Sequence, residues 1–306
     1  MAYFLYILIN NIVPISIMIT IGAVMYRAFR VDIKTLSKLN FYVFSPALVF
    51  VKLYESEMNL QVLMQVLLFF VLFFSLLFAL IEVVIRVKKM QGGMRSAMRN
   101  SVIFYNSANY AIPLNQTVFA GNAYTLSIQI VIMIMQTLIP NTYGIYTVNS
   151  HKSTWKATMK TILSLPVIYA IPVAILLRYF HLPVPHSVYL PLTYISGAFM
   201  ATALLTLGVQ LGAMKWEFHF SNVLISNVLR LAAGPALGFL LVWMLGIEGL
   251  TAKALVLSCA VPTSLSSVLL AIEYDNEPEF SSQAVFTSTL FSMFTLPVVI
   301  YLLDFM

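Results

Sequence analysis

The most constraining feature of the sequence is a series of apolar runs, each about twenty residues long. The run from Leu60 to Ile85 contains the string LLFFVLFFSLLFALI and carries no charge before Glu82. A helix needs about twenty apolar residues to cross a bilayer, whereas the strands of a membrane β-barrel alternate over about ten. Only 9% of the 306 residues are charged, so a soluble enzyme and a nucleic-acid-binding protein are excluded. The sequence indicates an all-α polytopic membrane protein.

Charged and turn-rich segments divide the chain into ten predicted transmembrane spans. The spans cover residues 4–26, 36–54, 60–84, 101–119, 124–146, 158–179, 189–213, 221–245, 250–272 and 281–303. The connections are short, and the segment 147–157 is the most polar and basic of those inside the chain. We therefore expect this segment to join two halves.

Basic residues gather at alternate connections and predict the orientation of the chain. The first, third and fifth connections carry Arg27, Arg30, Lys34, Lys38, Arg86, Lys88, Lys89, Arg95, Arg99, Lys152, Lys156 and Lys160. The even connections hold Glu55, Glu57 and Glu248 and few basic residues. Because basic residues mark the cytoplasmic side, we expect a multi-pass protein of the cytoplasmic membrane with both termini outside.

Prolines indicate an internal repeat. Pro14 and Pro166, Pro113 and Pro262, and Pro140 and Pro297 form pairs separated by 152, 149 and 157 residues. The near-constant separation predicts a first repeat over residues 1–149, a linker over 150–157 and a second repeat over 158–306. Each repeat has five spans, and this odd number inverts the second repeat relative to the first. Inverted repeats are typical of secondary transporters.

The fourth and ninth spans combine a proline with polar residues at mid-span. Proline removes an amide donor, and hydrocarbon offers the freed carbonyls no other partner. Two such broken helices could line a shared polar cavity, with half-helix N-termini that favour an anion. Alternatively, the polar side chains only hold helices together. The candidate substrate-binding residues are Asn106, Asn109, Tyr110, Pro113, Asn141, Pro262, Thr263 and Ser264.

Several motifs resemble a known family when they are taken in order. The eighth span carries R-x-x-x-G-P-A from Arg230 to Ala236, and the broken-helix proline Pro262 follows. An E-Y-x-x-x-P turn from Glu273 to Pro278 and a late Leu-Pro at Pro297 complete the series. Together these motifs resemble the auxin efflux carrier family, which includes plant PIN-type carriers and bacterial organic-acid permeases.

This resemblance implies a fold similar to the sodium/proton antiporters. The expected architecture is ten transmembrane helices in two inverted five-helix repeats, with a scaffold domain, a transport domain and broken crossover helices 4 and 9. It also implies a carboxylate substrate. Members of the family transport different carboxylates, so the resemblance does not identify which one this protein transports. A homodimer through the scaffold helices is a possible assembly.

Glu82 and Arg230 are ionisable residues within predicted spans. Because a charge at the bilayer centre is costly, Arg230 must face protein or water. It could act as a counter-charge to substrate, clamp the crossover, or pair with backbone carbonyls or Glu82. Glu82 is expected to lie at an interface, where its side chain either snorkels to the membrane surface or pairs; this interpretation is favoured over a role in proton coupling. The histidines are scattered, and no phosphate-binding loop or catalytic arrangement is found, so we expect no metal, no cofactor and no enzyme activity.

The leading hypothesis is a secondary carrier that moves a small organic anion by elevator-type alternating access. A receptor or sensor for a lipid or small molecule on the same fold is the alternative. A cation-coupled antiporter is disfavoured, because the aspartates Asp32, Asp275 and Asp304 all lie near span ends.

Overall fold

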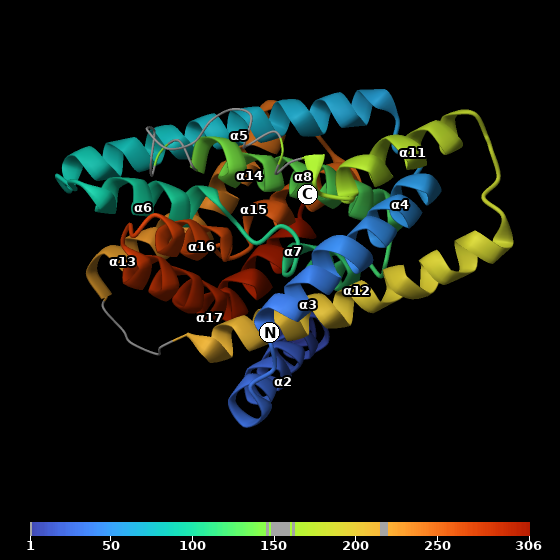
Figure 1. Ribbon diagram of the computed structural model, residues 1–306. Helices are drawn as coiled ribbons and strands as arrows, with labels where there is room; N and C mark the ends of the chain where they lie inside the picture. Colours follow the sequence, from blue (N-terminus) through green and yellow to red (C-terminus); the bar gives the residue numbers. More distant parts are fainter. Residues whose placement is uncertain (1, 145–146, 148–159, 161–162, 215–219) are drawn as a thin grey trace.

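The computed structural model describes residues 2–144, 147, 160, 163–214 and 220–306 (Figure 1). Within these residues the chain is helical, and it forms no β-strand beyond one isolated bridge. Seven helices are long and apolar enough to cross a membrane: Tyr3–Phe29, Ile33–Glu55, Leu60–Val87, Ala123–Gly144, His186–Ala213, Asn222–Met244 and Pro278–Leu303. The described residues confirm the prediction of an all-α fold with several helices able to span a membrane. The predicted linker 150–157 lies outside the described residues.

Three of the long helices contain a short π-helical segment just before a proline. The π segments are η1 (Leu8–Ile12), η2 (Asn40–Phe44) and η4 (Leu229–Ala233). Each precedes an α-helix with proline as its second residue, namely α2 (Val13–Phe29), α4 (Ser45–Glu55) and α14 (Gly234–Met244). Proline lacks an N–H and crowds the carbonyl four residues earlier. A wider turn relieves that crowding and keeps the helix continuous.

The first helix group consists of α2, α4, α11 (Val167–Tyr179) and α12 (His186–Ala213). The helix α12 packs against α2 and α4, and α11 packs against α4. Glycines allow α2 and α12 to approach closely. A Cβ atom on Gly208 would lie 2.0 Å from the carbonyl oxygen of Ile19, and one on Gly22 would lie 2.3 Å from that of Leu205. Side chains therefore cannot be added at this contact without separating the two helices.

The second helix group consists of the remaining long helices and two interrupted ones. It contains α5 (Leu60–Val87), α8 (Ala123–Ile139), α13 (Phe220–Val228), α14 and α17 (Pro278–Leu303). Between the groups, a cluster of buried apolar side chains joins α4, α11 and α12 to α8 and to Ile112. The groups thus meet across a mainly apolar surface.

Both interrupted helices have the same layout. An 11-residue helix, α6 (Gly93–Ile103) or α15 (Gly249–Cys259), leads into a non-helical segment. An 8-residue helix, α7 (Ala111–Val118) or α16 (Ser266–Glu273), then follows. We call the two non-helical segments, 104–110 and 260–265, the first break and the second break.

The structure shifts the fourth span from its predicted position. The expected span began at residue 101, but α6 begins at Gly93 and includes Arg95 and Arg99. The basic residues had suggested a loop here. The charge of Arg99 is accommodated within a helix because Arg99 pairs with Glu82 of α5. The first break also precedes Pro113, which is the third residue of α7. Proline is tolerated there, since the first amides of a helix have no intrahelical acceptor.

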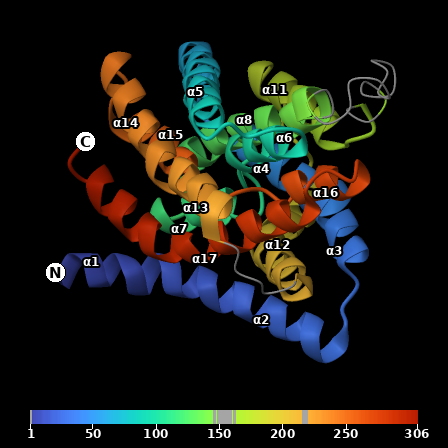
Figure 2. The ribbon, with the colours of Figure 1, turned by 90° about the vertical axis from the view of Figure 1, so that its left-hand side faces the viewer.

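The two ends of the chain lie at the same side of the molecule (Figure 2). The Tyr3 hydroxyl donates a hydrogen bond to the Asp304 carboxylate, and the Tyr3 and Tyr301 rings are in contact. Elsewhere, the Asn276 side chain donates to the Gly93 carbonyl at 3.3 Å. The turn after α16 therefore lies against the start of α6.

Candidate functional site

The two breaks pair with each other inside the second helix group. Tyr105 and Thr263 form an isolated antiparallel bridge. The Asn106 N–H donates to the Pro262 carbonyl at 2.8 Å, and the Ser264 N–H donates to the Phe104 carbonyl at 2.7 Å. Backbone groups that leave a helix inside a membrane protein need such partners. Each break therefore supplies part of the hydrogen bonding that the other one lacks.

Two glutamines of α8 bind further backbone groups at the end of α6 and in the first break. Gln136 donates to the Ile103 carbonyl at 3.2 Å and accepts from the Tyr105 N–H at 3.4 Å. Gln129 donates to the Ser107 carbonyl at 3.0 Å. Neither glutamine was predicted from the sequence to belong to the site. A signal was present, because a separation of seven residues puts two amides on one face of an otherwise apolar helix.

Side chains bind the second break in a similar way. The Thr263 N–H donates to the Ser288 hydroxyl of α17 at 3.1 Å. The Thr263 hydroxyl donates to the Ser101 carbonyl at 2.7 Å. Ser264 is half-buried, and its hydroxyl accepts from the Ser266 N–H at 3.3 Å. Thr263 therefore has a packing role, while Ser264 remains partly accessible.

Asn106 and Asn109 occupy different environments within the first break. Asn106 is 6% exposed, and its side-chain oxygen accepts from the Asn109 N–H at 3.1 Å. This contact stabilises the turn between α6 and α7. Asn109 is half-buried and lines a pocket. Only Asn109 of the two is therefore placed to contact a ligand in that pocket.

The pocket lies between the first break, α8 and the first helix group. Its polar lining comes from Asn40, Ser45, Asn109 and Thr137, and the remaining lining residues are apolar. No charged side chain is among the described residues that line it. Asn40, Ser45 and Thr137 were not selected from the sequence; the first two fall inside the predicted second span and Thr137 inside the fifth, away from the two proline-broken spans. Their grouping depends on tertiary packing.

Among the remaining candidates, Tyr110, Pro113 and Pro262 do not line this pocket. Tyr110 is fully buried, and its hydroxyl accepts from Ser292 of α17 at 3.0 Å. Pro113 is buried in α7 and Pro262 in the second break. Asn141 belongs to η3 (Pro140–Gly144), and its side chain lies outside what the structure describes.

The two intramembrane charges do not pair with each other. Glu82 forms its ion pair with Arg99. Arg230 is fully buried, and its guanidinium donates to the carbonyls of Val102, at 3.0 Å, and Cys259. Of the alternatives considered for Arg230, the structure shows contacts with backbone carbonyls beside the breaks.

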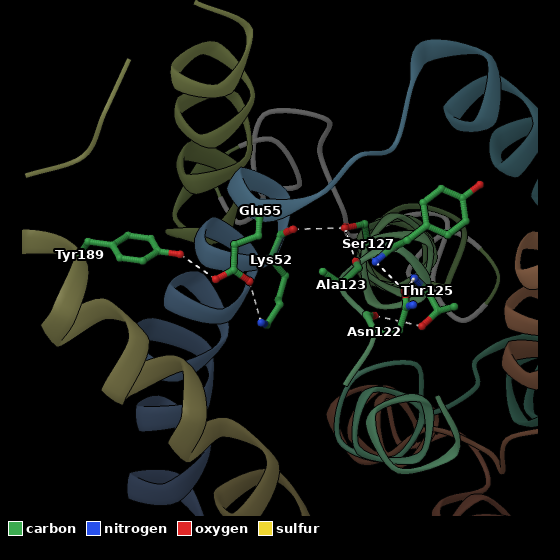
Figure 3. A network of polar contacts seen from close by, with 8 residues as sticks. Lys52, Glu55, Asn122, Ala123, Thr125, Ser127 and Tyr189 are labelled. Atoms are coloured by element: carbon green, nitrogen blue, oxygen red, sulfur yellow. Dashed lines mark hydrogen bonds and ion pairs between the residues drawn. The ribbon is translucent and has the colours of Figure 1, made fainter. Parts of the chain in front are cut away.

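A separate polar network connects α4, α8 and α12 (Figure 3). The Tyr189 hydroxyl donates to the Glu55 carboxylate at 2.7 Å, and the Lys52 ammonium lies 2.8 Å from the same carboxylate. The Ser127 hydroxyl donates to the Lys52 carbonyl at 3.2 Å. None of these residues lines the pocket. We interpret the network as a structural link between the two helix groups.

With this geometry established, the comparison with known proteins identifies the family. A family model described as a membrane transport protein matches residues 7–300. The chain belongs to this family, that of the auxin efflux carriers. The resemblance found in the motifs is thereby confirmed. The matched region includes both breaks, the pocket and Arg230 of this membrane transport protein.

Curated relatives agree with this assignment and carry names of the same kind. An uncharacterised transporter of Methanothermobacter thermautotrophicus is 21% identical over 268 residues, covering 87% of this chain and 88% of the relative. An uncharacterised transporter of Methanocaldococcus jannaschii is 24% identical over 110 residues, or 36% of each chain. The protein is therefore a polytopic membrane transport protein.

Proposed function

We propose that this protein carries a small organic anion, a carboxylate, across the cytoplasmic membrane by alternating access. The observation that carries the proposal is the pairing of two breaks beside a pocket that also touches the first helix group. A ligand in that pocket would contact both helix groups at once. Movement of one group against the other could then transfer it from one side of the membrane to the other.

The proposed architecture is ten spans in two inverted repeats. Seven long helices, two interrupted helices and α11 supply the spans. Support for the repeat comes from the interrupted helices, which share the same half-helix lengths of 11 and 8 residues. Under this proposal the first helix group belongs to the scaffold, and the interrupted helices cross within the transport domain.

An elevator-type movement fits the contact between the groups. The joining cluster is apolar, and apolar contacts are non-directional. Polar links such as the Ser127–Lys52 hydrogen bond are few and are individually weak, at about 1 kcal/mol each. The transport domain could therefore exchange one set of apolar contacts for another without leaving buried polar groups unpaired.

The anionic character of the substrate is supported by what surrounds the breaks. The lining of the pocket contributes amide and hydroxyl groups but no carboxylate. The helices α7 and α16 begin directly after the breaks, and helix N-termini favour negative charge. A carboxylate could therefore accept hydrogen bonds there without meeting a fixed negative charge.

Counterflow in proteoliposomes with a panel of labelled carboxylates tests this proposal. Wild-type protein should exchange at least one of them. Asn109→Ala should reduce exchange tenfold or more, since a hydrogen bond to a charged group contributes about 1.5–3 kcal/mol. The matched control is Asn10→Ala, because the exposed Asn10 side chain donates only to the Tyr6 carbonyl of its own helix; this variant should exchange like wild type.

Unchanged exchange by Asn109→Ala would remove the pocket from the proposal. If wild-type protein binds carboxylates in thermal-shift measurements but exchanges none, the receptor alternative replaces the carrier.

A further inference from the structure

Arg230 lies where two half-helices end. The helices α6 and α15 finish at Ile103 and Cys259. The Arg230 guanidinium donates to the carbonyl of Val102, in the last turn of α6, and to that of Cys259, the last residue of α15. One side chain therefore binds the carbonyl ends of both interrupted helices.

This position is electrostatically suited to a cation. The C-terminus of a helix carries about half a negative charge, so two such ends lie together here. Arg230 also stands over aromatic rings, with its guanidinium carbon 4.7 Å from the ring centre of Tyr105 and 5.9 Å from that of Phe73. Among the described residues, Arg230 has no acidic partner, and its buried Nε atom has no hydrogen-bond acceptor. Carbonyl dipoles and ring faces therefore surround the charge.

The R-x-x-x-G motif has a physical explanation in this contact. Gly234 lies one turn after Arg230, and a Cβ atom on it would lie 2.7 Å from Arg230 Nη2 and 2.9 Å from the Cys259 carbonyl oxygen. The segment η4, which carries Arg230, directly precedes α14, whose first two residues are Gly234 and Pro235. Glycine thus provides the space in which the guanidinium reaches α15.

We propose that Arg230 is a positioning residue whose side chain supplies a permanent cation beside the two breaks. Its positive charge neutralises the negative C-terminal ends of α6 and α15 and fixes the position of the two half-helices relative to each other. Without Arg230, the same carbonyls and ring faces form a vacant site that a guanidinium ion of matching shape can fill. Arg230 therefore does not serve as the counter-charge of the substrate, because its donors face the opposite ends of the half-helices from those that follow the breaks. This assignment goes beyond the proposed transport function and does not depend on it.

Cys259 gives the chain its own reporter for this contact. It is the one cysteine in the sequence, it is 1% exposed, and its carbonyl is one that Arg230 binds. Modification of its thiol requires the end of α15 to open. The rate of alkylation by N-ethylmaleimide in the folded, detergent-purified protein, followed by intact mass, therefore reports local opening.

The experiment compares wild type with Arg230→Ala, Arg230→Lys and Arg230→Gln. Loss of two charge-assisted hydrogen bonds in Arg230→Ala should raise the alkylation rate about a hundredfold. Millimolar guanidinium should restore much of the protection, whereas choline at the same concentration should not. Arg230→Lys, which keeps the charge, should remain better protected than Arg230→Gln, which keeps donors without charge.

Arg178→Ala is the matched control. Arg178 also donates to backbone carbonyls, those of Leu53, Ser56 and Met58, but none of them belongs to either break. Its loss should leave the alkylation rate of Cys259 near the wild-type rate.

Three results would overturn the proposal: wild-type protection in Arg230→Ala, equal restoration by guanidinium and choline, or protection in Arg230→Gln equal to or better than that in Arg230→Lys. If Arg230→Ala does not yield folded protein, the comparison of lysine with glutamine decides.

Discussion

At the scale of single residues, backbone context separates side chains of the same type. Asn106 and Asn109 lie three residues apart in one break, and sequence reasoning gave both the same role. The structure directs the Asn106 oxygen to a backbone N–H and places Asn109 at the pocket. Which asparagine faces a ligand could not be predicted, because the answer depends on where α6 ends. The sequence tied the break to Pro113, but α6 ends at Ile103 and Pro113 lies inside α7.

Asn106→Ala should destabilise the protein without acting through the pocket. The change removes the acceptor of the Asn109 N–H, and loss of a comparable asparagine cap costs about 0.5–2 kcal/mol. Thermal unfolding in detergent should show a lower midpoint for Asn106→Ala and an unchanged midpoint for Asn109→Ala. The reverse order of stabilities would contradict the distinction between the two residues.

Gln136→Leu should destabilise the first break more strongly. The substitution leaves the Tyr105 N–H and the Ile103 carbonyl without this partner, and each buried unpaired group costs about 1–3 kcal/mol. Gln61→Leu is a suitable control, since Gln61 is exposed on α5. Equal thermal midpoints for the two variants would show that Gln136 does not stabilise the break.

At the scale of elements, the sequence predicted which helices are interrupted but not how. Prolines identified the fourth and ninth spans, yet Pro262 lies in its break whereas Pro113 lies inside α7. The pairing of these two prolines therefore does not match equivalent positions in the two interrupted helices. Pro14, Pro46 and Pro235 produce π segments instead of breaks. Proline alone does not determine the outcome, because neighbouring elements decide whether the freed carbonyls find partners.

Gly208→Ala should weaken the packing of α2 against α12. The added methyl group would meet the Ile19 backbone, which cannot move aside as a flexible side chain could, and overpacking of this kind costs about 1–3 kcal/mol. Gly197→Ala in the same helix adds a methyl group with no atom within 4 Å and should be neutral or stabilising. Thermal midpoints that fall in both variants, or in neither, would show that this close contact does not support the helix pair.

At the scale of the whole molecule, the composition was sufficient to predict a polytopic helical membrane protein. The order of the motifs was sufficient to predict its family. The pocket was not predictable, because Asn40, Asn109 and Thr137 come from three elements separated in the sequence. The contact of Tyr3 with Asp304 places both termini at one end. The side of the membrane on which that end lies remains a prediction from the basic residues.

Cysteine labelling tests that orientation. In a Cys259→Ala background, single cysteines at Lys152 and Lys160 should resist a membrane-impermeant thiol reagent in intact cells, because positive connections stay in the cytoplasm. Cysteines at Glu55 and Glu248 should be labelled. Labelling of position 152 but not of position 248 would reverse the topology.

The most direct test of the account is whether the protein distinguishes a carboxylate from its uncharged amide. For the carboxylate that counterflow identifies, tracer uptake into proteoliposomes should be at least tenfold faster than for the matching amide. This expectation follows because charge-assisted hydrogen bonds contribute about twice as much as neutral ones. Equal uptake of the two compounds would contradict the proposal that the pocket beside the two breaks binds an organic anion.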